Sequence, residues 1–136
     1  MHTKTQASVR FIVLFTGVFN TLIALATLFA PELFYNALAD FPPFNRHFLG
    51  DIGAFMLGPS LALLFAARNP GKHRLLIGAV ALSNLIHFGN HLYDDILIEH
   101  GGTLHWLTNT LPLLALTILL SIAFFISRER NQEHSQ

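Results

Sequence analysis

The sequence predicts an all-α fold: a bundle of four transmembrane helices that forms a single membrane domain over residues 1–136. The first observation behind this prediction is composition. Of the 136 residues, 52% are hydrophobic and only 12% are charged, about half the charged share that is usual in soluble domains. The second is that the apolar residues fall into four long runs. The third is that basic residues gather in alternate links between the runs, as in chains that cross a membrane repeatedly.

The four apolar runs match the thickness of a bilayer. We expect helices at about 9–29, 46–67, 75–93 and 104–126. A hydrocarbon core of about 30 Å requires about 20 helical residues. Only helices and closed barrels satisfy their backbone hydrogen bonds in lipid, and these runs are too long and continuous for the strands of a barrel.

The first run also has features of a secretory signal peptide. Lys4 and Arg10 stand at its start, and Ala24-Leu25-Ala26 resembles a cleavage site. The apolar run continues to Phe29, which is longer than the apolar region of a typical signal peptide. We therefore expect this segment to remain as the first transmembrane helix.

Lysine and arginine predict the orientation of the chain. The first link carries one basic residue, Arg46, and the third link carries none. The other seven lie in the two terminal segments and the second link: Lys4, Arg10, Arg68, Lys72, Arg74, Arg128 and Arg130. The positive-inside rule then predicts that both termini are cytoplasmic in a multi-pass plasma (inner) membrane protein.

Two polar pairs stand at the expected outer ends of the second and third helices. His47 and Asp51 are four residues apart, and so are His87 and His91, so each pair lies on one helix face. Because the two helices run in opposite directions, Asp51 and His87 should lie at similar depth. Ionisable groups in a membrane are costly and usually face the bundle interior, where they pair with one another.

A divalent metal ion would satisfy both pairs. Imidazoles and a carboxylate suit Zn²⁺, and similar sets bind iron, so we expect Zn or Fe. The expected ligands are His47, Asp51, His87 and His91, with Asp94, Asp95 and His105 as additional ligands or hydrogen-bond acceptors. Two other interpretations stay open: a metal-free hydrogen-bonded cluster, and unrelated residues at the membrane interface, where Tyr93 and Trp106 fit the aromatic belt.

Other features of the composition exclude whole classes of chemistry. The chain has no cysteine, which excludes disulfides, thiolate metal sites and a cysteine nucleophile. Its formal net charge is zero with histidine neutral, so the sequence gives no reason to expect a nucleic-acid partner. The expected partner is the lipid bilayer. A small lipophilic ligand and association of several copies are both compatible with such a chain.

The layout of the chain resembles the small DoxX-like four-helix membrane proteins. The resemblance covers most of the length: an apolar first helix, "APELF" after it, then "FNRHFLGDIGAFMLG", the basic turn "ARNPGKHR" and a third helix with a polar end. This resemblance implies a respiratory or redox-accessory role at most, and it supplies no catalytic residues.

Three classes of function follow from these observations. The first is a metal-dependent enzyme acting on a lipid-soluble substrate, in which the metal activates water. The second is a redox accessory subunit that binds quinone or haem, and haem would take one axial histidine from each of two helices, for example His47 with His87 or His91. The third is a non-catalytic metal-binding or scaffold protein. The sequence leaves the choice among them open.

Overall fold

The computed structural model describes residues 2–38, 43–98 and 106–128, and every regular element in this part of the chain is a helix. Two short segments are wider, π-type helices. In chain order the elements are α1 (His2–Phe29), α2 (Pro31–Ala37), α3 (Arg46–Ala66), α4 (Arg74–Tyr93), η1 (Asp94–Ile98), η2 (Trp106–Thr110) and α6 (Leu111–Arg128).

Four helical segments are long and apolar enough to cross a membrane, as the sequence predicted. They are Thr5–Phe29, Arg46–Ala66, Arg74–Leu97 and Trp106–Ser127. Large apolar side chains are exposed along all four, for example Phe11, Phe55, Leu75 and Phe125. Such a surface is favourable against lipid and costly in water, so the molecule is built as a multi-pass membrane protein.

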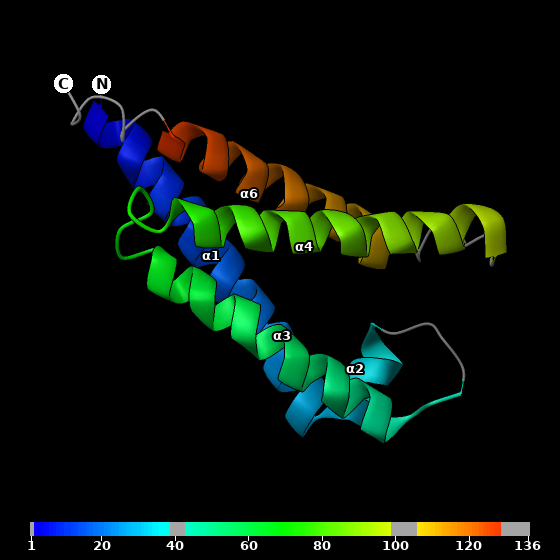
Figure 1. The fold of residues 1–136 in the computed structure, drawn as a ribbon. Helices are drawn as coiled ribbons and strands as arrows, with labels where there is room; N and C mark the ends of the chain where they lie inside the picture. Colours follow the sequence, from blue (N-terminus) through cyan, green and yellow to red (C-terminus); the bar gives the residue numbers. More distant parts are fainter. Residues whose placement is uncertain (1, 39–42, 99–105, 129–136) are drawn as a thin grey trace.

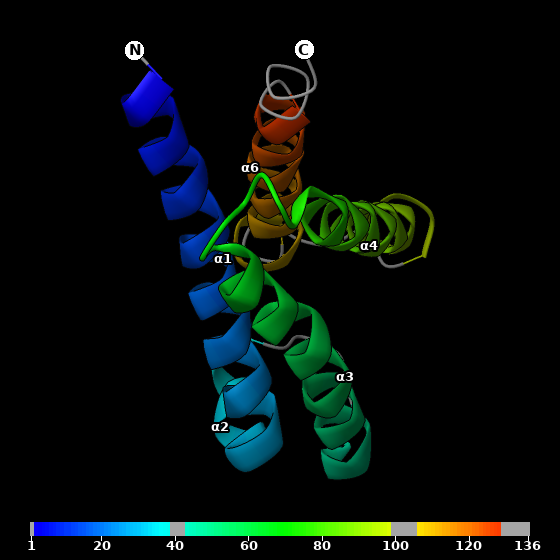
Figure 2. The same ribbon diagram turned by 60° about the vertical axis from the view of Figure 1, so that its left-hand side comes forward.

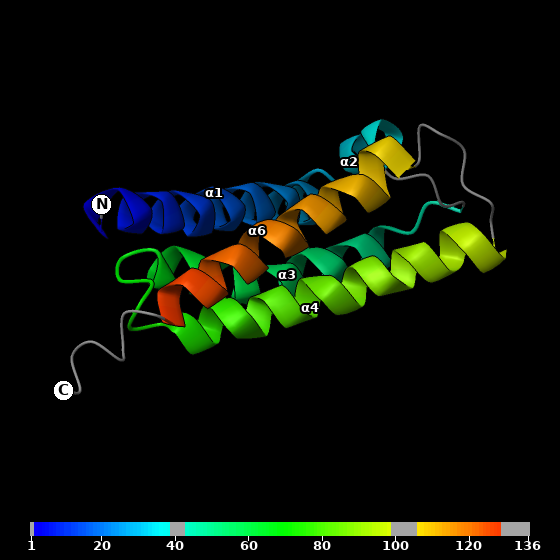
Figure 3. The ribbon, with the colours of Figure 1, turned by 90° about the horizontal axis from the view of Figure 1, so that it is seen from above.

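The four spans are arranged as two antiparallel helical hairpins (Figure 1). Helix α1 packs chiefly against α3, and α4 packs chiefly against α6. The start of α1, the link 67–73 and the end of α6 lie together, and we call this the terminal end. At the opposite, distal end lie α2, η1 and η2. The two hairpins diverge toward the distal end, and Figures 1 and 2 show this divergence from two sides. In the view from above, the two hairpins overlap (Figure 3).

The buried core lies toward the terminal end, where all four spans meet. One cluster of buried apolar side chains draws on every span: Val9, Val13, Leu63, Ala66, Ala67, Ile77, Val80, Ala81, Leu120 and Ala123. Since the hairpins share this core only near the terminal end, the positions of α3 and α4 at the distal end are set mainly by packing within each hairpin.

Two glycines allow α1 and α3 to approach closely. A Cβ atom added at Gly17 would lie 2.9 Å from Leu64 Cδ2, and one added at Gly53 would lie 2.7 Å from the carbonyl oxygen of Ala24. Small residues at such contacts are typical of membrane helices, because close packing replaces the hydrophobic driving force that lipid removes.

The structure adds elements that the sequence did not predict. Helix α2 begins at Pro31, with Glu32 in its first turn, and both residues favour a helix start. The third span continues beyond Tyr93 as η1. The fourth span begins with η2, which ends just before Pro112. A proline ring clashes with the carbonyl group one turn earlier in a regular α-helix, and a wider π-type turn relieves that clash.

Candidate functional site

The first predicted pair, His47 and Asp51, lies at the start of α3. Asn45 caps this helix: its side-chain oxygen accepts a hydrogen bond from the backbone N–H of Phe48 at 3.0 Å. His47 Nε2 lies 3.5 Å from Asp51 Oδ2, and the two side chains are 89% and 70% exposed. The predicted contact within this pair is therefore present, but the pair lies on the surface of the hairpin and not in its interior.

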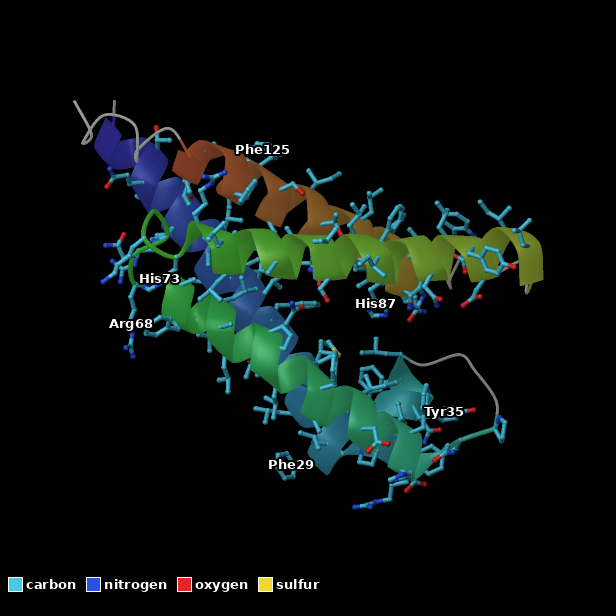
Figure 4. The ribbon with its side chains drawn as sticks, in the orientation of Figure 1. Phe29, Tyr35, Arg68, His73, His87 and Phe125 are labelled. Atoms are coloured by element: carbon cyan, nitrogen blue, oxygen red, sulfur yellow. The ribbon has the colours of Figure 1, made fainter. Side chains whose placement is uncertain are left out.

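The second predicted pair, His87 and His91, lies in the last two turns of α4. Their ring centroids are 4.9 Å apart, so two imidazoles point from one face of the helix. Figure 4 shows His87 on the side of α4 that looks toward the other hairpin. One turn further, the side-chain amide of Asn90 donates a hydrogen bond to Asp94 Oδ2 at 3.2 Å.

The two pairs are not brought together. In the described part of the chain, no group of three or more His, Cys, Asp or Glu side chains is arranged to hold a metal ion. The physical reason is the divergence of the hairpins: each pair forms within one helix, whereas a shared site needs the distal ends of α3 and α4 to lie side by side. His105, predicted as an additional ligand, lies outside the described residues.

Among the acidic groups that the structure describes at the distal end, Asp95 is the most buried. Its side chain in η1 is only 4% exposed, and it accepts a hydrogen bond from the hydroxyl of the fully buried Thr110 in η2. This contact joins the last turn of the third span to the first turn of the fourth. π-type turns are rare and often occur at functional sites.

Sequence reasoning included Asp95 as an additional ligand or acceptor but missed Thr110. The sequence contains a feature that indicates Thr110: the polar segment "TNT" at 108–110 stands near the beginning of an otherwise apolar run. A hydroxyl so placed in a membrane helix needs a hydrogen-bond partner, and a nearby carboxylate is the strongest one.

A shallow cavity of about 300 Å³ lies apart from these groups, between the end of α1, α2 and the start of α3. Its lining is Phe29, Ala30, Pro31, Glu32, Leu33, Phe44 and Arg46. This volume is at the lower end of the range for small-molecule sites. No histidine in the described ranges borders this cavity, so it is separate from the two predicted pairs.

At the distal end, the third span thus carries a polar strip along α4 and η1: His87, Asn90, His91, Asp94 and Asp95. Two neutral imidazoles at i and i+4 can direct ring nitrogens at one ion, which is the arrangement of many helix-borne metal sites. Comparison with family models, curated proteins and solved structures finds no match for the chain, so its function has to be argued from these residues.

Proposed function

We propose that this multi-pass membrane protein binds a divalent metal ion at the distal end of α4. The observation that supports the proposal is the His87–His91 pair, whose ring centroids lie 4.9 Å apart on one helix face. Zn²⁺ and Fe²⁺ both accept imidazole nitrogen. Water or a bound molecule supplies the remaining ligands. The described residues bring no third ligand to the pair, so the proposal concerns metal binding alone.

The larger site of His47, Asp51, His87 and His91 is the extended form of this proposal. It requires the two hairpins to close at the distal end. Such closure would bury His47 and Asp51, which are largely exposed in the structure. Ionisable groups in a membrane are stabilised by this kind of pairing.

Metal analysis of the purified protein tests the proposal. In protein purified in detergent without chelator and supplemented with Zn²⁺ or Fe²⁺, we expect close to one bound ion per chain. His87→Ala and His91→Ala should each weaken binding by more than about 100-fold, because even the hydrogen-bond partners of metal ligands are commonly worth 10–100-fold. Elemental analysis and a titration give both quantities.

The control is His73→Ala, because His73 lies at the terminal end, where its ring contacts that of Phe65 with 4.6 Å between the centroids. It should leave metal binding unchanged. The double variant His47→Ala/Asp51→Ala weakens binding if the hairpins close around one ion and leaves it unchanged if α4 acts alone. Wild-type protein that stays metal-free with its fold intact would contradict the proposal. A haem absorption band in the purified protein would also contradict it and would favour a haem-binding redox subunit.

We also propose that both termini are cytoplasmic, which the distribution of lysine and arginine supports. The chain has no cysteine, so single cysteines report topology directly. Thr5→Cys and Asn36→Cys place thiols at exposed positions near the start of α1 and in α2. A membrane-impermeant thiol reagent added to intact cells should label Asn36→Cys and spare Thr5→Cys. The opposite labelling pattern would invert the topology.

A further inference from the structure

The described acidic residues and most of the described basic residues lie at opposite ends of the molecule. All four described acidic residues, Glu32, Asp51, Asp94 and Asp95, lie toward the distal end. Arg68, Lys72 and Arg74 lie within seven residues at the terminal end, around the link between α3 and α4. We call these three residues the 68–74 patch. No acidic side chain of the described chain lies at this end to neutralise it.

The link that carries the patch has a defined conformation. The backbone N–H groups of Arg68 and Asn69 donate to the carbonyl groups of Phe65 and Ala66 at 3.2 and 3.1 Å. The side-chain oxygen of Asn69 in turn accepts from the backbone N–H of Lys72 at 3.3 Å. Arg68 and Lys72 are exposed, and Figure 4 shows Arg68 and His73 at the terminal end. The cationic groups are therefore presented from an ordered turn.

Arg74 has an unused hydrogen-bond donor. Its guanidinium lies over the ring of Phe124, with 4.4 Å between Cζ and the ring centroid. Its Nε is buried and has no hydrogen-bond partner among the described residues. Buried donors are usually paired, so this guanidinium still has capacity for an acceptor. Arg74 also begins α4, and the preceding residue, His73, makes no side-chain cap.

Exposed apolar side chains border the patch on the membrane side. Leu75, next to Arg74, is 79% exposed, and Phe65, three residues before Arg68, is 48% exposed. Arg68 Cζ lies 5.9 Å from the Phe65 ring centroid. A molecule that matches this surface carries a negative charge beside long apolar chains. Free phosphate matches only the first part, and an anionic phospholipid matches both.

We propose that Arg68, Lys72 and Arg74 bind the phosphate group of an anionic phospholipid whose acyl chains lie along Phe65 and Leu75. Basic residues beside membrane spans attract anionic lipids, and each contributes roughly fivefold in affinity. The guanidinium groups donate hydrogen bonds to phosphate oxygens. The proposal is independent of the metal site, because it uses the opposite end of the molecule.

Lipid analysis of reconstituted protein tests this inference. The full chain is placed in bilayers of equal phosphatidylcholine and phosphatidylglycerol, extracted gently, and its bound lipid measured by mass spectrometry. We expect wild-type protein to retain phosphatidylglycerol in excess over phosphatidylcholine. Arg68→Gln/Lys72→Gln should lower that preference by about 25-fold, the product of two roughly fivefold losses. Both side chains are exposed, so the fold should survive.

Arg46→Gln is the matched control. It removes one cation from an exposed position on α3 at the distal end and should leave the preference unchanged. The charge-retaining variant Arg68→Lys/Lys72→Arg should keep it. Equal retention of the two lipids by wild-type protein, or an undiminished preference in Arg68→Gln/Lys72→Gln, would overturn the inference. Loss of the bound lipid when inorganic phosphate is added would also overturn it, because the site would then be one for free anions.

Discussion

Gly53→Ala should destabilise the protein by about 1–3 kcal/mol, the usual cost of forcing an extra methyl group into a packed interface. The added Cβ would lie 2.7 Å from the carbonyl oxygen of Ala24 and 2.8 Å from Leu28 Cγ, and it would also collide with the hydroxyl of Thr27. The carbonyl belongs to the α1 backbone and cannot rotate away. Relief requires α1 and α3 to separate, and this is the most extensive contact between helices in the described structure.

The matched control is Gly50→Ala on the same helix. A Cβ atom added at Gly50 meets no atom within 4 Å outside its chain neighbours and its own helix backbone, so this change should be neutral, or stabilising by up to about 1 kcal/mol because glycine is a poor helix former. Circular dichroism during unfolding by SDS or heat, in one detergent, measures both variants. Equal stability of the Gly53→Ala and Gly50→Ala proteins would show that α1 and α3 are not packed as described.

Thr110→Val should also destabilise the protein. Valine keeps the shape of threonine but removes the hydroxyl that donates to Asp95. Asp95 is 4% exposed and Thr110 fully buried, so the carboxylate loses a donor that water cannot easily replace. The expected cost is about 1–3 kcal/mol. The loss of stability should be greatest around the contact between η1 and η2. The rate of hydrogen exchange of the backbone amides in these two turns should therefore increase.

Thr117→Val provides the comparison for this prediction. Thr117 is also buried on α6, but its hydroxyl donates to the carbonyl of Leu113 within the same helix. That carbonyl keeps its helical hydrogen bond, so the change should cost little. A double-mutant cycle of Thr110→Val with Asp95→Leu should give a coupling of about 0.5–3 kcal/mol. A coupling of zero, with Thr110→Val no worse than Thr117→Val, would contradict the pairing.

The spans could be predicted because length and hydrophobicity are local properties. The uncharged run at 104–126, for example, corresponds to the span Trp106–Ser127. The end of the third span was harder to predict. Two consecutive acidic residues after Tyr93 indicated its end, yet the helix continues because Asp95 is buried against Thr110. Such a contact joins residues 15 positions apart, and no periodicity reveals it.

The same distinction applies to the candidate site. A spacing of four residues correctly predicted that His47 lies near Asp51 and His87 near His91. Whether the two pairs meet depends on the angle between the hairpins, which is set by packing around Leu63, Ile77 and other core residues far from the site. The four-ligand arrangement therefore stays a prediction, whereas the contacts within each pair are present in the structure.

The divergence of the hairpins gives the molecule a wedge-shaped profile across the bilayer. Its cross-section is small where the four spans share a core and grows toward α2 and η1 (Figure 1). The angle between the hairpins of a wedge-shaped protein depends on membrane curvature. Bending that expands the leaflet around the distal end favours wider separation of the two hairpins, and bending that compresses this leaflet favours their approach. Lateral pressure in that leaflet would then act on the distance between the His47–Asp51 and His87–His91 pairs.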